Sequence, residues 1–316
     1  MLGGFKVFSG NSNRALAEKV CSHLNVSLGE ALVGQFSDGE VRVEVQENVR
    51  GMDVFVIQST CAPINQNLIE LLVMIDALKR SSASKVTAVI PYYGYARQDQ
   101  KIQPRVAVAA KVVANMLGAA GVDRIVAIDL HAGQIEGFFT IPVENLSGLK
   151  VLLNDARERL VNGGVVVAPD AAGVRRARAF AAALNMDLAI MDYRDFPFED
   201  RSRVVGTVKG RPVVVVDDMI NTGNTFMRAL EAARASGAAS VEGYCIHPVL
   251  SAESFNRLEN SHFEAVTVTD TIPQVEKFSK SKKFRVVTVS DMLAEAILRI
   301  HEEKSISSDF LISSGA

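Results

Sequence analysis

The segment from Val213 to Thr225, V-V-V-V-D-D-M-I-N-T-G-N-T, carries the strongest chemical signal in the chain. Its four valines predict a fully buried parallel strand. Two acids, Asp217 and Asp218, are expected where this strand ends, and a helical pattern begins near Phe226. The polar turn between them consists of Asn221, Thr222, Gly223, Asn224 and Thr225. Backbone N–H groups at such a turn bind phosphate, and the acids can accept hydrogen bonds from sugar hydroxyls, so the segment predicts a ribose-phosphate site.

A second polar segment, Y-Y-G-Y-A-R-Q-D-Q-K from Tyr92 to Lys101, follows a predicted strand that ends at Pro91. The planar guanidinium of Arg97 can pair with a polyphosphate. The same segment also fits a solvated loop whose tyrosines pack inward. The residues alone leave these two interpretations open.

A metal site is suggested by His131 and Asp170. His131 follows the predicted strand I-V-A-I-D and precedes Ala-Gly. A neutral imidazole at a strand end can bind metal or phosphate, although a lone histidine is more often structural. Asp170 stands at the matching place in the second half of the chain, so the two residues predict a shared Mg²⁺ site. His247 also ends a strand, but it precedes Pro248 and is expected to be structural.

The segment F-S-D-G-E, from Phe36 to Glu40, is a turn before a strand. Phe36 can stack on a base, and Asp38 and Glu40 can reach base or ribose edges. The Asp-Gly pair equally favours an ordinary hairpin turn. A nucleotide contact and a plain turn therefore both remain open.

These residues are positioned by short apolar strands that alternate with amphipathic helices, which predicts parallel sheets with helices on both faces. Expected strands are Phe5–Ser9, Val41–Val45, Val54–Gln58, Val86–Pro91, Arg124–Asp129, Gly164–Pro169, Leu188–Asp192, Pro212–Val216, Ser240–Ile246, Ala265–Thr269 and Arg285–Val289. Expected helices are Ser12–Asn25, Ile64–Arg80, Val106–Gly121, Leu149–Leu160, Gly173–Leu184, Thr225–Ser236, Glu253–Glu259 and Ser290–Glu303. All the polar clusters follow strands, and ligands of such sheets bind at the carboxyl ends of strands.

The two halves of the chain look alike, because each contains a strand that ends in proline and a later strand that ends in polar residues, Asp129 and His131 in the first half and Asp217 and Asp218 in the second. We therefore expect two copies of one α/β domain, covering residues 1–145 and 146–316 and joined near Ile141 to Gly148. Whether the last helix packs on the first domain stays open. A length of 316 residues also favours two domains.

The composition excludes several classes of protein. A hydrophobic fraction of 48% and a charged fraction of 22% are typical of a soluble globular protein. A net charge of −2 argues against general binding of nucleic acid or anionic membranes. No apolar run approaches the ~20 residues of a membrane span, and the first residues do not fit a secretory signal. The scattered Cys21, Cys61 and Cys245 fit reduced thiols in a cytoplasmic protein.

Taken together, the motifs resemble the ribose-phosphate pyrophosphokinase (phosphoribosyl pyrophosphate synthetase) family over nearly the whole chain. The matching segments are S-G-N-S-N-R at Ser9–Arg14, F-S-D-G-E, E-N-V-R-G at Glu47–Gly51, N-L-I-E-L-L-V-M-I-D-A-L-K-R at Asn67–Arg80, I-P-Y-Y-G-Y-A-R-Q-D, D-L-H-A-G-Q-I-E-G-F-F at Asp129–Phe139, H-P-V-L-S at His247–Ser251 and L-A-E-A-I-L-R-I-H-E-E-K-S-I-S at Leu293–Ser307. The resemblance implies an α/β fold of two tandem phosphoribosyltransferase-type domains, each a mainly parallel sheet flanked by helices. It also implies a homo-oligomer, a hexamer built from dimers.

The resemblance implies transfer of the β,γ-pyrophosphoryl group of ATP to the anomeric hydroxyl of ribose 5-phosphate, with release of AMP. It implies ATP contacts by Phe36, Asp38 and Glu40 across a subunit boundary, and by Arg97, Gln98 and Asp99. It implies a Mg²⁺ cofactor on His131 and Asp170, a catalytic role for Arg194 and His131, ribose hydroxyls on Asp217 and Asp218, and the 5-phosphate on Asn221, Thr222, Gly223, Asn224 and Thr225. Inorganic phosphate and ADP are implied effectors, with Arg50 and Arg105 as candidate anion contacts.

The chain departs from the family's pattern near the reacting groups. The family's flexible loop carries K-R-R, whose Lys and second Arg are the catalytic cations, whereas this chain reads Tyr193, Arg194 and Asp195. Removing one charge contact to a transition state costs ~10²–10³ in rate, and removing an arginine finger ~10³–10⁵. Other departures are Gln100 for Arg, Ala172 for Gly, Asn221 for Asp and Asn224 for Gly. Cations that can substitute are Arg201, Arg203 and Lys209.

Three functions remain open on sequence. The first is an active ribose-phosphate pyrophosphokinase with an unusual loop. The second is a catalytically weak paralogue that binds nucleotide and regulates or co-assembles with an active enzyme. This function explains why the assembly and ATP-side motifs match the family while the catalytic loop does not. The third is a phosphoribosyltransferase that acts on a base, which the nucleotide-side motifs disfavour.

Overall fold

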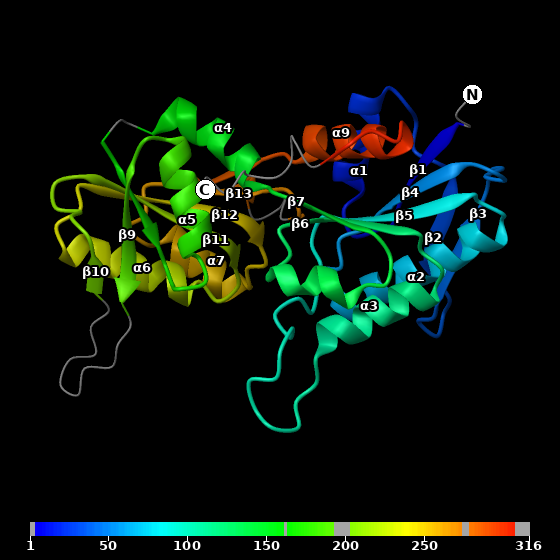
Figure 1. Cartoon of the computed structure of the whole chain (residues 1–316), viewed down its shortest axis with the longest axis horizontal. Coiled ribbons are helices and arrows are strands. Elements are labelled where there is room, and N and C mark those ends of the chain that lie inside the picture. Colours follow the sequence, from blue (N-terminus) through cyan, green and yellow to red (C-terminus); the bar gives the residue numbers. More distant parts are fainter. Residues whose placement is uncertain (1–3, 161–162, 193–202, 274–277, 307–316) are drawn as a thin grey trace. The chain divides into compact units, whose positions relative to one another are not determined.

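The computed structural model of the chain describes residues 4–160, 163–192, 203–273 and 278–306. These residues fall into two compact units (Figure 1). Unit 1 contains the described residues up to Ser147, together with Thr271–Pro273 and those from Val289 onward. Unit 2 contains the described residues from Gly148 to Asp270, and those from Phe278 to Thr288.

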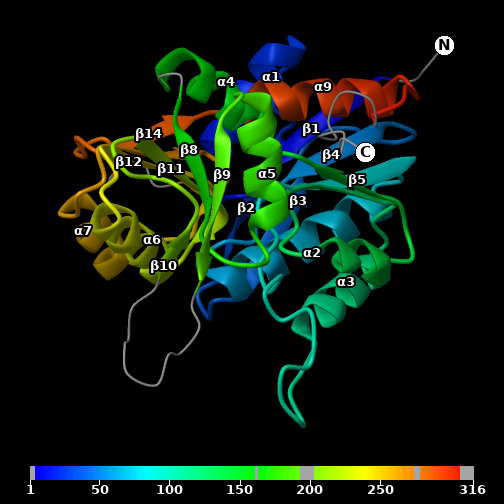
Figure 2. The same ribbon diagram turned by 60° about the vertical axis from the view of Figure 1, so that its left-hand side comes forward.

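Unit 1 is built on a five-stranded sheet whose strands are all parallel. Its strand order is β1 (Phe5–Ser9), β4 (Asp53–Ile57), β5 (Lys85–Ile90), β6 (Arg124–Ile128) and β7 (Val143–Leu146). Helices α1 (Arg14–Leu24) and α9 (Ser290–His301) cover one face, and α2 (Ile64–Arg80) and α3 (Ala109–Ala119) cover the other (Figures 1 and 2). The central strands are apolar and almost fully buried, as expected for a sheet covered on both faces.

A two-stranded hairpin and a short helix of unit 1 lie outside this sheet. The strands β2 (Ala31–Gln35) and β3 (Val41–Val45) pair antiparallel and form a hairpin. A short 3₁₀ helix, η1 (Gly133–Phe138), follows β6. The apolar residues of β3 alternate with polar ones, which is the pattern of a strand with one face packed on the protein.

The last helix packs back on the beginning of the chain. Helix α9 contacts α1, and each helix buries an apolar stripe. At its C-terminal end, His301 Nδ1 lies 3.2 Å from Asp53 Oδ2 at the start of β4. Helix α9 therefore belongs to unit 1, although the chain of unit 2 precedes it.

Unit 2 is built on a seven-stranded sheet. Its strand order is β10 (Arg203–Val205), β9 (Asp187–Asp192), β8 (Val165–Ala168), β11 (Pro212–Ile220), β12 (Ser240–Pro248), β13 (Val266–Thr269) and β14 (Phe284–Val287). All neighbours are parallel except β10, which runs antiparallel to β9. Helices α4 (Leu149–Arg159) and α5 (Val174–Ala183) lie on one side of the sheet, and α6 (Asn224–Ala235) and α7 (Ala252–Glu259) on the other (Figure 2).

The order of strands in unit 2 reverses between β8 and β11, because the chain goes from β8 outward to β9 and then returns to add β11 on the opposite side. In open α/β sheets, ligands bind at the carboxyl ends of the strands that flank such a reversal. The segments that leave β8 and β11 contain Asp170 and the turn from Asn221 to Thr225. The topology therefore places both segments at the position where a ligand is expected.

The prediction that β11 ends at Val216 was wrong, because the strand continues to Ile220. Beyond Val215, the strand loses its β8 partner but keeps its ladder with β12 as far as Ile220 and Pro248. Asp217 and Asp218 therefore lie inside β11 and not after its end. They are in the part of β11 that extends past its pairing with β8. The prediction for β12 was short for the same reason, since both strands extend together.

Most of the other expected elements are present with ends shifted by a few residues, and α2 has the predicted bounds. The strands β2, β7 and β10 and the helix η1 were not predicted. Strand β7 occupies the middle half of the segment that was expected to join the two domains, because it adds to the edge of the first sheet beside β6.

Candidate functional site

The two acids of β11 form the centre of the site in unit 2. The side chains of Asp217 and Asp218 are nearly buried, with 10% and 8% of their surface exposed. Asp217 Oδ1 accepts the backbone N–H of Asp218 at 2.9 Å, which holds the first carboxylate against the strand. Burial, and then the charge of Asp218, raise the pKa of Asp217 above its usual range, and the charge of Arg176 opposes this shift.

Arg176 is a member of this site that the sequence reasoning did not identify. It lies in the first turn of α5, the helix that follows Asp170, and its Nη1 donates to Asp217 Oδ1 at 3.1 Å. The same Nη1 lies 3.7 Å from Asp218 Oδ1. The signal was available in V-R-R-A-R-A-F, because Arg176 stands four residues before Phe180 and the helical period therefore puts it at the edge of the buried stripe.

The predicted phosphate turn follows β11 and leads directly into α6. Gly223 takes the left-handed conformation, with φ of 72°, and Asn224 is the first residue of the helix. The N–H of Asn224 points to Thr222 Oγ1 at 3.4 Å. The N-terminal N–H groups of a helix have no intrahelical partners, so this turn has the backbone geometry of an anion site.

Asp170 lies in the turn between β8 and α5. Its Oδ1 accepts the N–H of Gly173 at 2.8 Å, which closes the turn ahead of the helix. Ala172, at the position where the family carries glycine, is exposed in this turn and has an ordinary negative φ. Asp170 follows β8, and β8 pairs with β11, the strand that carries Asp217 and Asp218.

In unit 1, the segment from Tyr92 to Lys101 has the inward-packed tyrosines of one interpretation, and the polyphosphate contact of the other stays a prediction. Tyr92 and Tyr93 are buried, and Tyr93 Oη donates to the carbonyl of Ala110 at 3.0 Å. Arg97 and Gln98 are exposed. The tyrosines thus anchor the segment while the predicted nucleotide contacts face outward.

Two details fix the path of this segment. The N–H of Gly94 donates to Thr60 Oγ1 at 2.6 Å, and a Cβ at Gly94 would lie only 2.3 Å from the carbonyl oxygen of Thr60. Asp99 is 8% exposed, and its Oδ2 accepts Gln134 Nε2 at 2.7 Å. Asp99 therefore has a protein partner in η1, and its expected contact with nucleotide stays a prediction.

His131 lies after β6 and is exposed. The turn before it is fixed by two hydrogen bonds: Asp129 N–H donates to the Leu146 carbonyl at 2.9 Å, and Leu130 N–H donates to Asn145 Oδ1 at 3.0 Å. Asp129 has a positive φ of 38°, which turns the chain sharply at the end of the strand. His131 thus stands at the carboxyl end of a strand in unit 1, as Asp170 does in unit 2.

The segment from Phe36 to Glu40 is the tip of the β2–β3 hairpin, as the Asp-Gly pair indicated. The N–H of Phe36 donates to the Glu40 carbonyl at 2.8 Å, and Asp38 Oδ1 accepts the N–H of Glu40 at 3.1 Å. The ring of Phe36 is 52% exposed, with the guanidinium of Arg42 5.8 Å from its centroid. An aromatic ring in this position is accessible to a ligand or a neighbouring chain.

The remaining predicted cations are scattered. Arg50, Arg105 and Lys209 are exposed, and Arg203 lies in β10 opposite Asp192. Tyr193, Arg194, Asp195 and Arg201 lie outside the described residues. Among the residues that are described, no group of three or more His, Cys, Asp or Glu side chains is arranged to hold a metal ion. No helix within the described ranges combines the length and apolarity needed to cross a membrane.

Comparisons with known proteins show which family this chain resembles. Residues 5–121 match a family model described as the N-terminal domain of ribose phosphate pyrophosphokinase, and residues 197–311 match one described as the phosphoribosyl synthetase-associated domain. The ribose-phosphate pyrophosphokinase of Ralstonia nicotianae is 51% identical over 310 residues, which cover 97% of this chain and 98% of that protein. The protein of the same name from Chromobacterium violaceum is 49% identical over 316 residues, covering 98% and 97%.

A solved structure extends the likeness to the fold. The crystal structure of phosphoribosylpyrophosphate synthetase from Mycobacterium smegmatis matches with a TM-score of 0.89 and 38% identity, covering 95% of this chain and all of that one. The predicted α/β fold, with two tandem phosphoribosyltransferase-type domains, is confirmed. The identity, the coverage of both chains and the shared fold lead to one conclusion: this chain belongs to the ribose-phosphate pyrophosphokinase family.

Proposed function

We propose that the protein is a ribose-phosphate diphosphokinase, which transfers pyrophosphate from ATP to the anomeric hydroxyl of ribose 5-phosphate and produces phosphoribosyl pyrophosphate and AMP. One observation carries the proposal. The paired acids Asp217 and Asp218 lie on the same strand that leads into the phosphate turn, at the carboxyl end of a sheet whose strand order reverses there. In a chain of this family, the acids suit the hydroxyls of ribose 5-phosphate and the turn suits its phosphate.

The residues of unit 2 would act by positioning the sugar. The carboxylates of Asp217 and Asp218 accept hydrogen bonds from ribose hydroxyls, and the N–H groups between Asn221 and Thr225 donate to the 5-phosphate. Contacts at both ends of the sugar fix the anomeric hydroxyl in one place. Because phosphoryl transfer depends mostly on positioning and charge neutralisation, such fixation contributes directly to rate.

The ATP side of the proposal rests on unit 1. Arg97 and Gln98 are exposed at the end of a segment that buried tyrosines anchor, so they can reach a nucleotide without a change in the packing around them. Phe36, Asp38 and Glu40 lie at an exposed hairpin tip, which suits contact with adenine bound by a neighbouring subunit. His131 stands at the carboxyl end of β6, where it can face a phosphate.

Mg²⁺ is the cofactor that we propose, because the carboxylate of Asp170 and the phosphates of the substrates are oxygen donors that suit it. Mg²⁺ prefers oxygen ligands and is usually held by one or two carboxylates, with substrate phosphates and water completing its shell. Asp170 uses one carboxylate oxygen for Gly173 N–H and retains acceptor capacity for a cation, and His131 is the second ligand in this proposal. Bound there, Mg²⁺ would neutralise the charge that develops on the transferred phosphates.

Assembly and regulation form part of the same proposal. We expect a homo-oligomer, a hexamer built from dimers, in which the β2–β3 hairpin of one subunit completes the ATP site of another. Inorganic phosphate and ADP are the expected effectors, and the exposed Arg50 and Arg105 are candidate contacts for them. A cytoplasmic location is supported by Cys21, Cys61 and Cys245, which are all free and buried.

A second candidate function is favoured by one sequence observation. Tyr193 and Asp195 stand where the family's catalytic Lys and second Arg are expected. A chain without these cations would bind its substrates but catalyse the transfer slowly, and it would then act as a regulatory subunit of an active synthetase.

AMP formation from ATP, measured with and without ribose 5-phosphate in Mg²⁺ and phosphate buffer, separates these functions. Formation of AMP that is stoichiometric with phosphoribosyl pyrophosphate and depends on ribose 5-phosphate is the result expected for the synthetase. A folded protein that binds ATP but forms no AMP would contradict the proposal and favour the regulatory subunit.

A further inference from the structure

Helix α7 forms a wall behind the phosphate turn. The N–H of Leu250, in the segment before α7, donates to the carbonyl of Ile220 at 3.0 Å. A Cβ at Gly223 would lie 3.4 Å from Leu258 Cδ1 and 3.8 Å from Ser254 Cβ, so the left-handed turn at Gly223 packs closely on this helix. Leu258 is fully buried and Ser254 almost so. The position of the turn is therefore coupled to α7.

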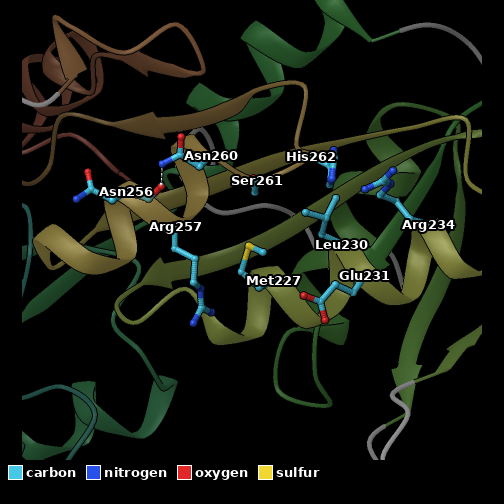
Figure 3. A pocket seen from close by; sticks show the side chains of 9 residues that line it. All are labelled: Met227, Leu230, Glu231, Arg234, Asn256, Arg257, Asn260, Ser261 and His262. Carbon is cyan, nitrogen blue, oxygen red and sulfur yellow. Dashed lines mark hydrogen bonds between the residues drawn. The ribbon is translucent and has the colours of Figure 1, made fainter.

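One hydrogen bond connects α7 to the first residue of α6. Arg257 Nη2 donates to Asn224 Oδ1 at 2.8 Å, across 33 residues of sequence. Arg257 lines a groove of about 620 Å³ between α6 and α7, where it reaches from α7 toward α6 beside Met227 (Figure 3). Arg234 and His262 lie at the other end of this groove (Figure 3).

This hydrogen bond has a chemical consequence for the phosphate turn. Asn224 is the first residue of α6, and an asparagine side-chain oxygen there can accept hydrogen bonds from nearby backbone N–H groups. Those N–H groups are the donors that a bound phosphate requires. In this chain, Arg257 engages the Asn224 side-chain oxygen, so that the oxygen does not compete with phosphate for the N–H groups of the first turn.

We propose that Arg257 is a positioning residue for the 5-phosphate, and that it acts through Asn224. The inference rests on the proposed function, because it assigns a specificity role at the ribose 5-phosphate site. Arg257 holds the Asn224 side chain on α7 and keeps the first turn of α6 fixed with its N–H groups directed to the ligand. Its contribution is to affinity for the phosphorylated sugar, not to the transfer step.

The test compares Arg257→Ala with a matched control, Arg234→Ala, which removes an exposed arginine from the other end of the same groove. For Arg257→Ala, we expect KM for ribose 5-phosphate to rise about 3- to 10-fold, the effect of one exposed hydrogen bond, with kcat and KM for ATP unchanged. Arg257→Gln, which can still donate to Asn224, should recover most of the loss. Arg234→Ala should match the wild type.

A double-mutant cycle identifies the route of the effect. Asn224→Gly removes the side chain that Arg257 holds, so Arg257→Ala should cause no further loss in that background. An equal loss in both backgrounds would show that Arg257 does not act through Asn224 and would overturn the inference. An unchanged KM for ribose 5-phosphate in Arg257→Ala would overturn it as well.

Calorimetric titration of ribose 5-phosphate without ATP separates this inference from the proposed function. Binding to the wild type that is weakened in Arg257→Ala supports the positioning role, even if AMP formation is slow. Binding that is equal in the two proteins overturns the positioning role alone. No binding to the wild type would overturn the proposed function and this inference with it. Faster amide hydrogen exchange at residues 224–227 in Arg257→Ala is the expected independent readout, and unchanged exchange would contradict the inference.

Discussion

Nη1 of Arg176 lies 3.1 Å from Oδ1 of Asp217 and 3.7 Å from Oδ1 of Asp218, so one guanidinium faces two nearly buried carboxylates. One positive charge cannot balance two negative ones, and the excess is relieved when Asp217 holds a proton. Under the proposed function, ribose hydroxyls would relieve it in another way, by donating hydrogen bonds to the carboxylates. The excess negative charge that would favour binding of the sugar also destabilises the folded protein when no ligand is bound.

The first prediction concerns Asp217→Asn and the pH dependence of stability. The folded-state pKa of Asp217 is raised by burial and by Asp218, above the unfolded value of about 3.9. The folded protein therefore binds this proton more tightly, and its stability falls as pH rises from about 4 through the folded-state pKa. Asp217→Asn should remove this part of the decline, so that the variant's Tm exceeds that of the wild type above neutral pH, while affinity for ribose 5-phosphate is lost.

Thermal unfolding measured from pH 5 to pH 9 checks this prediction. The control Asp76→Asn removes an exposed carboxylate of α2 and should keep the wild-type slope of Tm against pH. Parallel slopes for Asp217→Asn and the wild type would contradict the raised pKa.

The second prediction concerns Arg176→Met, which leaves two carboxylates nearly buried without their cation. Removing one partner of a buried ion pair costs ~3–5 kcal/mol. The loss in unfolding free energy should be smaller at pH 5 than at pH 8, because Asp217 is then protonated in the folded state. Urea unfolding at the two pH values measures it. The control Arg178→Met changes an exposed arginine of the same helix and should cost little at either pH. A pH-independent loss for Arg176→Met would contradict the proposed charge balance.

The third prediction concerns Gly94→Ala in the segment that presents Arg97. The added Cβ would lie 2.3 Å from the carbonyl oxygen of Thr60, so the segment must move. We expect a loss of ~1–3 kcal/mol in unfolding free energy, as for overpacking in a core, and a raised KM for ATP with little change for ribose 5-phosphate. Gly118→Ala, in α3 where the added Cβ meets no atom within 4 Å, should leave both kinetic constants unchanged. Equal effects of Gly94→Ala on both substrates would show that the segment is not specific to ATP.

The fourth prediction rests on the family's loop pattern. The double change Tyr193→Lys with Asp195→Arg restores both cations and should raise kcat ~10²-fold or more if their loss limits turnover. The matched variant Tyr193→Met with Asp195→Asn removes the acid without adding a cation, and it should give a smaller gain. Initial rates of AMP formation measure both. No gain from the first variant would rule out lost cations as the reason for slow turnover.

The sequence predicted the elements that are long and strongly periodic. Helix α2 has the predicted bounds because its apolar stripe is regular and Pro63 precedes its first residue. The strands β2 and β7 were missed because they are short and lie outside or at the edge of the main sheet, where pairing with a neighbour, and not local pattern, decides the structure. Asp217 and Asp218 were assigned to a strand end because the apolar run stops there, but the ladder with β12 continues past it.

Some residues of the candidate site could be predicted from the sequence, and others could not. Motifs that are contiguous in sequence, such as the turn before α6, were identified directly. Arg176 and Arg257 were not, because each reaches its partner from another helix, across 41 and 33 residues of sequence. The helical period can single out Arg176 on α5, but only the folded chain shows that Arg176 meets Asp217 and that Arg257 meets Asn224.

The packing of α9 on α1 has a consequence for folding during translation. Translation produces all the described strands of unit 2 before it reaches Ser290, so α9 can complete unit 1 only after those strands have been made. During that interval, the apolar stripe of α1 that α9 later covers stays exposed, which is the kind of surface that chaperones bind. A nascent chain stalled before Ser290 would carry a nearly complete second unit and an unfinished first one, so the usual order of domain folding is reversed in its final step.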